Sequence, residues 1–238
     1  MESGDQMAAF INGLRALRLV ANLSVVSCAM FTWDYIITFG MEVDLVWKSN
    51  WSLMKVLYLI QRYLPFIDTA WLMVYALTKT GLTKTACQKI YLTSSASIAI
   101  GVTTSELILT LRTWAVWERN RRLSIILPTL YVFLWFPNYI IDGMFLSSLK
   151  FIDPPYPGIQ GCFMTYTMNI KYLTFSWILL AFWDALMLVL MLIPTIREYR
   201  SGGTLMKVVY RDGVGYYLYL FALSVTNMLM IQTLPVSR

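Results

Sequence analysis

Ionisable side chains inside long apolar stretches are the residues of this sequence that could do chemistry. They are Asp34, Arg62, Asp68, Glu106, Asp142 and Asp184. A charge at bilayer depth is costly, usually faces the interior of a helix bundle and is a functional candidate by default. Counted inward along each helix at about 1.5 Å per residue, Arg62 lies at a depth between those of Glu106 and Asp184. We therefore expect Arg62 to pair with one of these two carboxyl groups.

Four of these residues are predicted to form an intramembrane charge network: Asp34, Arg62, Glu106 and Asp184. Two roles stay open for this network. It could be an interhelical salt bridge that only fixes helix packing, or it could bind a ligand or move a proton.

Asp68 needs a partner other than Arg62. Six residues separate the two, which places their side chains about 120° apart around a helix. Asn138, Asn227 or water in a cavity of the outer half could serve, and Asp142 lies near the outer surface. The resulting ligand-binding hypothesis comprises Asp68, Asn138, Asp142 and Asn227.

Several kinds of chemistry are excluded by composition. The sequence contains no histidine, which removes Ser-His-Asp and Cys-His nucleophiles and His-ligated zinc or haem. Three cysteines are too few for a four-cysteine metal site. Lysine is missing from the middle of every apolar stretch, so no retinal Schiff base is expected, and the paired Asp-rich motifs of metal-diphosphate prenyltransferases are absent. No metal site, cofactor or catalytic residue is predicted.

The elements that must position these residues are transmembrane helices. The chain is 58% hydrophobic and 13% charged, against about half and about a quarter in soluble domains. A membrane-crossing helix needs about 20 apolar residues, and six windows fit: 19–39, 53–78, 90–113, 123–146, 172–196 and 213–234. Their apolar character is continuous, which indicates helices rather than barrel strands. We predict an all-α polytopic bundle that forms one domain over residues 1–238, with 40–51 as an interfacial segment whose Glu42 faces water.

Orientation follows from the basic residues and the cysteines. Arg119, Arg121 and Arg122 lie in the gap between the third and fourth windows, and basic loops favour the cytoplasm. Cys87 and Cys162 then fall on the outer face, where a disulfide can persist. We expect that bond, with two unpaired thiols as the alternative, and we expect the N-terminus outside the cell or in a lumen.

Several separated motifs carry a family resemblance. They are 33–39 (WDYIITF) with Glu42, Val43 and Trp47; 51–53 (WSL) and 62–65 (RYLP); 111–115 (LRTWA) with the basic cluster 119–122; and 211–213 (RDG) with Asn227. In this order they resemble a large uncharacterised family of fungal (basidiomycete) integral membrane proteins, over nearly the whole chain. The resemblance implies a domain of unknown function, with no activity or catalytic residue to transfer.

The resemblance also implies a seventh apolar helix, which is missing before Arg238. With it, the helix order, the outer disulfide and the basic inner end of the third helix would be similar to seven-transmembrane receptors. We therefore expect a receptor-like sensor of a small or lipidic ligand rather than an enzyme. An intramembrane enzyme acting on a lipid or isoprenoid is the alternative, with Glu106, Asp184 or Asp68 as acid or base.

The expected partners follow from the same argument. They are membrane lipids, a small-molecule or lipid ligand and an unidentified cytoplasmic protein, but no nucleic acid. The plasma membrane and an endomembrane both remain open as the location.

Overall fold

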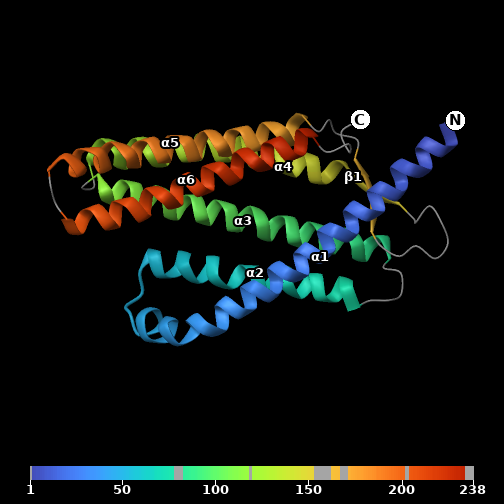
Figure 1. Cartoon of the computed structure of the whole chain (residues 1–238), viewed down its shortest axis with the longest axis horizontal. Coiled ribbons are helices and arrows are strands. Elements are labelled where there is room, and N and C mark those ends of the chain that lie inside the picture. Colours follow the sequence, from blue (N-terminus) through green and yellow to red (C-terminus); the bar gives the residue numbers. More distant parts are fainter. Residues whose placement is uncertain are drawn as a thin grey trace. The chain divides into compact units, whose positions relative to one another are not determined.

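The computed structural model describes residues 2–77, 83–117, 120–152, 162–166, 171–201 and 204–233. Helices make up most of this part (Figure 1). They are α1 (Glu2–Glu42), α2 (Leu53–Leu77), α3 (Lys84–Val116), α4 (Arg121–Ser148), α5 (Lys171–Ser201) and α6 (Thr204–Thr233), with a π-helix η1 (Val43–Trp47) and two short strands, β1 (Leu149–Ile152) and β2 (Phe163–Tyr166). The predicted all-α class is confirmed.

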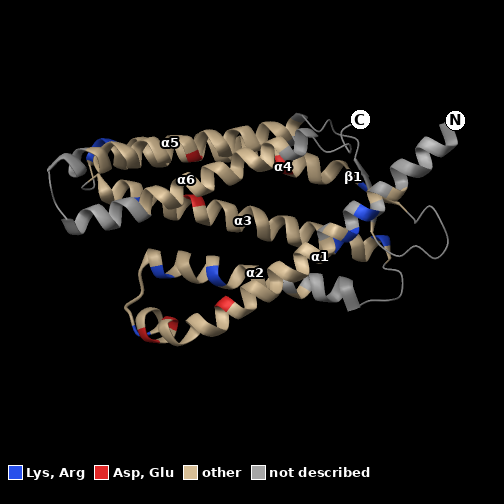
Figure 2. Cartoon of the chain, in the orientation of Figure 1, with Lys and Arg blue, Asp and Glu red and all other residues tan. Residues whose placement is uncertain are grey.

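A helix occurs at each of the six predicted windows. Four stretches are long and apolar enough to cross a membrane within the described residues: Ala21–Trp47, Lys84–Val116, Arg121–Ser148 and Thr174–Ile196. Helix α6 contributes a shorter apolar stretch, Gly213–Leu229. Charged residues are sparse along the helices (Figure 2). These features fit a multi-pass integral membrane protein.

The helices begin where the sequence supplies caps. The Thr83 side chain accepts a hydrogen bond from the Ala86 backbone N–H at the start of α3. The Asn120 side chain does the same for the Arg122 N–H at the start of α4. Such caps satisfy backbone donors that have no partner inside the helix.

Two compact units divide the chain, and α3 contributes to both. Unit 1 comprises Met1–Gly81 with Thr93–Gly101, and unit 2 comprises Leu82–Leu92 with Val102–Arg238. In unit 1, α1 passes through η1 and a short connection into α2 (Figure 1). This turn brings the C-terminal part of α1 against α2.

The core of unit 2 lies among α3, α4, α5 and α6. Its buried members are Leu109, Leu127, Trp183, Met187, Met191 and Tyr217. Strands β1 and β2 form an antiparallel ribbon in which Leu149 pairs with Tyr166 and Ile152 with Phe163. Cys162, just before β2, forms a disulfide with Cys87 near the start of α3, with a Cα–Cα distance of 5.7 Å. The structure thus contains the predicted bond.

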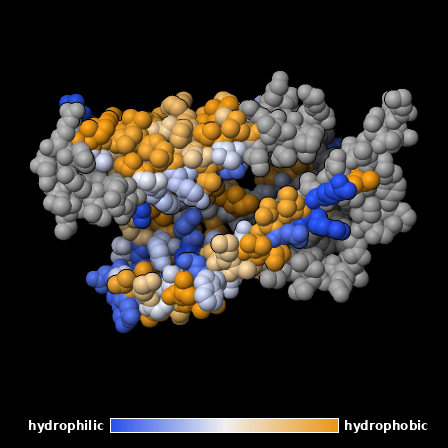
Figure 3. All heavy atoms as spheres, in the orientation of Figure 1, coloured by the Kyte–Doolittle hydropathy of each residue, from blue (hydrophilic) through white to orange (hydrophobic). Residues whose placement is uncertain are grey.

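Large apolar side chains also cover the outside of the helices. Met30, Trp33, Ile125, Phe133 and Phe136 are each more than 60% exposed, and broad hydrophobic areas lie over the helices of unit 2 in Figure 3. Water would penalise so much exposed apolar surface, whereas lipid does not. The bilayer is therefore the solvent for these faces.

Candidate functional site

Arg62 of α2 is the centre of a charged cluster in unit 1. Asp34, Thr38 and Glu42 follow each other at four-residue intervals on α1, which places them on one helix face. The Arg62 guanidinium donates to Asp34 Oδ2 at 3.0 Å, to Glu42 Oε2 at 3.3 Å and to the Thr38 hydroxyl. These contacts join α1 to α2.

Glu42 is the buried member of this cluster. It is only 3% exposed, whereas the sequence predicted that it faces water. Its Oε1 accepts from the Tyr63 hydroxyl at 2.8 Å and from the Trp47 indole N–H at 3.0 Å. The reason for the difference is that α1 continues through Glu42 and η1 turns Trp47 back onto it. Both carboxylate oxygens have partners, so this cluster is suited to holding the α1–α2 turn rather than to reacting.

Lys55 supports the same turn. Its ammonium group donates to the Ser49 carbonyl at 2.7 Å and to the Trp47 carbonyl at 3.1 Å. It also lies 4.8 Å from the centre of the Trp51 ring, in cation–π range. The Lys55 ammonium group thus has backbone and aromatic partners.

Glu106 of α3 and Asp184 of α5 form a second polar contact, in unit 2. They are 5% and 3% exposed, and their carboxyl groups lie within hydrogen-bonding range of each other. Ser224 of α6 donates its hydroxyl to Asp184 Oδ2. Among the described residues, no Lys or Arg forms an ion pair with either carboxyl group. The partners that the structure records for Arg62 are instead Asp34 and Glu42.

A carboxylate only accepts hydrogen bonds, so two carboxyl groups can bond to each other only when one carries a proton. No described donor reaches Glu106 Oε2 or Asp184 Oδ1. The contact can therefore hold a proton between α3 and α5. We name Glu106, Asp184 and Ser224 the carboxyl contact.

Further bonds join the same helices near the C-terminal end of α3. The Tyr217 hydroxyl of α6 donates to the Leu109 carbonyl at 2.9 Å and lies 3.1 Å from the Thr113 hydroxyl. The Trp117 indole N–H donates to the Leu190 carbonyl of α5 at 2.9 Å. These bonds connect the carboxyl contact to the segment that precedes the basic cluster.

The structure brings together only some of the four residues in the ligand-binding hypothesis. Asn138 donates to Asp142 Oδ2 at 3.3 Å within α4, and Ser176 of α5 donates to Asp142 Oδ1 at 3.0 Å. Asn227 is exposed on α6. Asp68 belongs to α2, and its side chain lies outside the described part. The structure thus brings together Asn138 and Asp142 of the predicted group.

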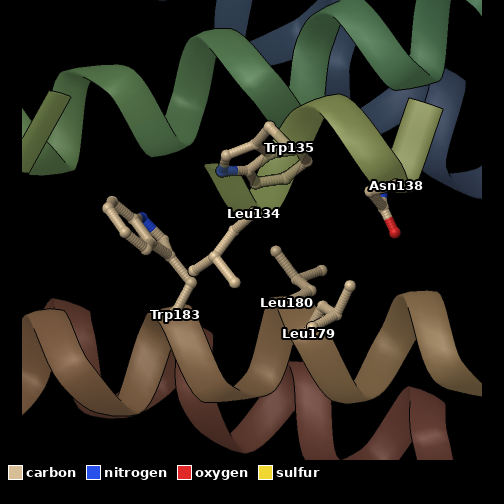
Figure 4. A pocket seen from close by; sticks show the side chains of 6 residues that line it. All are labelled: Leu134, Trp135, Asn138, Leu179, Leu180 and Trp183. Atoms are coloured by element: carbon tan, nitrogen blue, oxygen red, sulfur yellow. The ribbon is translucent and has the colours of Figure 1, made fainter. Parts of the chain in front are cut away.

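A small cavity lies between α4 and α5, with about 10 Å³ of free space. Its lining residues are Leu134, Trp135, Asn138, Leu179, Leu180 and Trp183 (Figure 4). Sequence reasoning included Asn138 but missed the two tryptophans. Their position was the available signal, because membrane-anchoring tryptophans lie at the ends of spans, whereas Trp135 and Trp183 lie inside α4 and α5.

Metal ligands do not cluster in the part of the chain that the structure describes: no group of three or more His, Cys, Asp or Glu side chains gathers there. Cys28 is a buried free thiol on α1.

Comparison with known families gives one informative match. Residues 22–67 match a family of unknown function (DUF6533). This range contains the whole Arg62 cluster, from Asp34 to Tyr63, and the earlier of the resembling motifs. The motifs beyond Pro65 lie outside it. Comparisons with curated proteins and with solved structures give no match. The α1–α2 region is therefore similar to this family.

Proposed function

We propose that this multi-pass membrane protein is a receptor-like sensor of a small or lipidic ligand, from a fungus, with its N-terminus outside the cell or in a lumen. The carboxyl contact is the observation that carries this proposal. It joins α3, α5 and α6 through two buried carboxyl groups and a hydroxyl rather than through an ion pair.

Such a contact is suited to switching. A buried polar bond between helices is either made or broken, so a small shift of one helix changes the state of the contact rather than stretching it gradually. A ligand that binds one helix arrangement more tightly would shift the population of the two states. The bonds of Tyr217 and Trp117 extend the same connection toward the inner end of α3.

An intramembrane enzyme acting on a lipid or isoprenoid is the second candidate. It is favoured by one observation: neither Glu106 nor Asp184 has a basic ion-pair partner among the described residues, and a buried carboxyl without a counter-ion can donate a proton. Against it, the α4–α5 cavity is small and neither carboxyl lines it. A substrate therefore lacks a described space beside the acid.

The two candidates are distinguished by one experiment on the purified chain in lipid nanodiscs. The probes are oleic acid, ergosterol and farnesol, each added in turn. Thermal unfolding reports binding, mass spectrometry of the recovered probe reports chemistry, and a fluorophore on Arg121→Cys reports movement at the start of α4. A sensor raises the unfolding temperature with one probe, changes the fluorescence and returns the probe unaltered.

The matched variants are Ser224→Ala and Thr226→Val, both hydroxyl deletions on α6. Ser224 is buried against Asp184, whereas Thr226 is exposed and bonds to its own helix. Ser224→Ala should reduce the fluorescence change at equal probe occupancy, and Thr226→Val should not. If the chain converts a probe into a product and Glu106→Gln abolishes this conversion, the protein is an enzyme and the sensor proposal is wrong.

A further inference from the structure

The exposed side of α6 contains an amide group that the described part of the chain does not satisfy. Asn227 is exposed, and no hydrogen bond joins its side chain to another described residue. It belongs to the apolar stretch Gly213–Leu229, and the six residues of α6 that follow it extend about 9 Å. Lipid tails neither donate nor accept hydrogen bonds, so an amide at this depth requires a polar partner.

The neighbouring polar side chains of α6 have partners inside the chain. The Ser224 hydroxyl donates to Asp184 Oδ2. The Thr226 hydroxyl donates to the Ala222 carbonyl of its own helix at 2.7 Å. In this segment of the described chain, Asn227 therefore differs from its neighbours in presenting an unbonded polar group to the lipid.

Asn227 is the last member of a ridge of exposed residues on α6. Gly215, Tyr219 and Leu223 precede it at four-residue intervals, so the four residues lie along one row of the helix surface. Tyr219 is 60% exposed and Leu223 is 40% exposed, and a Cβ added to Gly215 would meet nothing within 4 Å. Ridges with this spacing pack into the grooves of a second helix. We name these four residues the α6 ridge.

The partner that the α6 ridge fits is a second copy of the chain. Copies inserted into one membrane have the same orientation, so a two-fold axis between them runs along the bilayer normal. Each residue near this axis then meets its own counterpart at the same depth. An asparagine amide has both donors and an acceptor, so each of two Asn227 side chains can donate to the carbonyl oxygen of the other. The ridge contains no charged residue, so two copies of it do not repel each other.

We propose that this protein forms a two-fold dimer through the α6 ridge, in which the two Asn227 amide groups are hydrogen-bonded to each other. Tyr219 and Leu223 supply the apolar packing beside this bond, and Gly215 lets the two helix backbones approach closely. The dimer is independent of the sensor function, because it uses none of the three residues of the carboxyl contact.

The first test is disulfide cross-linking of the whole chain in phosphatidylcholine vesicles. Asn227→Cys and Leu218→Cys are each combined with Cys28→Ser, which removes the free thiol of α1. Leu218 is 55% exposed on α6 but does not belong to the α6 ridge. Under mild oxidation, Asn227→Cys should form a covalent dimer several-fold faster than Leu218→Cys. Equal rates at the two positions would overturn the proposed dimer.

The second test is the equilibrium between monomer and dimer, measured by energy transfer between labelled chains as the vesicles are diluted with lipid. Asn227→Leu removes the paired amides and should weaken association about tenfold. Asn227→Gln keeps both the donors and the acceptor and should weaken association less. Asn22→Leu, the same change at an exposed residue near the start of the apolar stretch of α1, should leave association unchanged.

Three results of the second test would contradict the dimer. The native chain is monomeric at every dilution, or Asn227→Leu associates as tightly as the native chain does. The third concerns thermal unfolding of the most dilute, monomeric samples. If Asn227→Leu lowers the unfolding temperature there by more than Asn22→Leu does, the Asn227 amide is bonded within its own chain and is not available to a second copy.

Discussion

Arg62 forms ion pairs with two carboxylates of α1. Replacing it tests how much these ion pairs contribute to the stability of unit 1. In Arg62→Met, Glu42 is left buried with its charge unpaired. Removing one partner of a buried pair costs roughly 3 kcal/mol or more of unfolding free energy. We expect a loss of this size by equilibrium unfolding in mixed micelles, and the double variant Arg62→Met/Glu42→Gln should recover part of it.

The control is the exposed pair of Lys48 and Asp44, whose nitrogen and oxygen are 2.6 Å apart. The side chains of that pair are 69% and 68% exposed, against 13% and 1% for Arg62 and Glu42. Lys48→Met should change the unfolding free energy by only about 0.5 kcal/mol, as exposed pairs do. Equal losses in Lys48→Met and Arg62→Met would show that burial of Glu42 does not matter.

The carboxyl contact makes a spectroscopic prediction at the same scale. Because Glu106 and Asp184 can bond only through a proton, the infrared spectrum at neutral pH should contain the carbonyl band of a protonated carboxyl group. The difference between the native chain and Glu106→Gln should contain that band. The difference between the native chain and Asp44→Asn, an exposed carboxyl, should not. Absence of the band in the first difference would mean that both groups are ionised or separated.

The partner of Arg62 illustrates what a single sequence can and cannot specify about a residue. Counting residues along the spans gives depth, and depth favoured Glu106 or Asp184. It does not give the rotation of a helix or its neighbour. Consecutive helices joined by a short connection are usually adjacent, and α1 presents Asp34, Thr38 and Glu42 on one face toward α2. Arg62 therefore pairs with acidic groups of the preceding helix, Asp34 and Glu42.

At the scale of elements, the disulfide connects α3 to the ribbon of β1 and β2 over a sequence separation of 75 residues. Closing so long a loop restricts the unfolded chain, with a typical gain of about 2–4 kcal/mol. We expect Cys87→Ser, Cys162→Ser and the double variant to lower the unfolding temperature by the same amount, because each removes the same bond. Cys28→Ser, on a free thiol of α1, should have a smaller effect. Additive losses in the double variant would argue against a bond between these two cysteines.

Hydropathy located the helices but not their ends. The window 19–39 lies inside α1, Glu2–Glu42, and the window 123–146 lies inside α4, Arg121–Ser148. Hydropathy identifies the apolar stretch of a helix that lies in the hydrocarbon core. The ends of the helix depend instead on capping residues such as Asn120. Strands β1 and β2, with four residues each, were not predicted, because runs this short carry little periodic signal.

At the scale of the whole molecule, the proposed orientation depends on α3. Its 33 residues extend about 50 Å at about 1.5 Å per residue, more than the roughly 30 Å of the hydrocarbon core. Its two ends therefore emerge on opposite sides of the membrane. Cys87, in a disulfide, lies near the first end, and the basic residues Arg121 and Arg122 follow the second. Disulfides persist outside the cytoplasm, and basic loops favour the cytoplasm. Both rules therefore predict that the first end of α3 lies outside and the second end inside.

That agreement is tested by labelling intact cells with an impermeant thiol reagent. Gly158→Cys, between β1 and β2 in the sequence, should react, and Asn120→Cys should react only after permeabilisation. The sequon of Asn50, Trp51 and Ser52 should remain unglycosylated, because the turn between α1 and α2 is then cytoplasmic. Labelling of Asn120→Cys alone would mean that the orientation is the reverse of the proposed one. The disulfide would then lie in a reducing compartment, and the sensor proposal would lose its ligand-binding face outside the cell. The carboxyl contact would remain, and the enzyme would then become the better account of it.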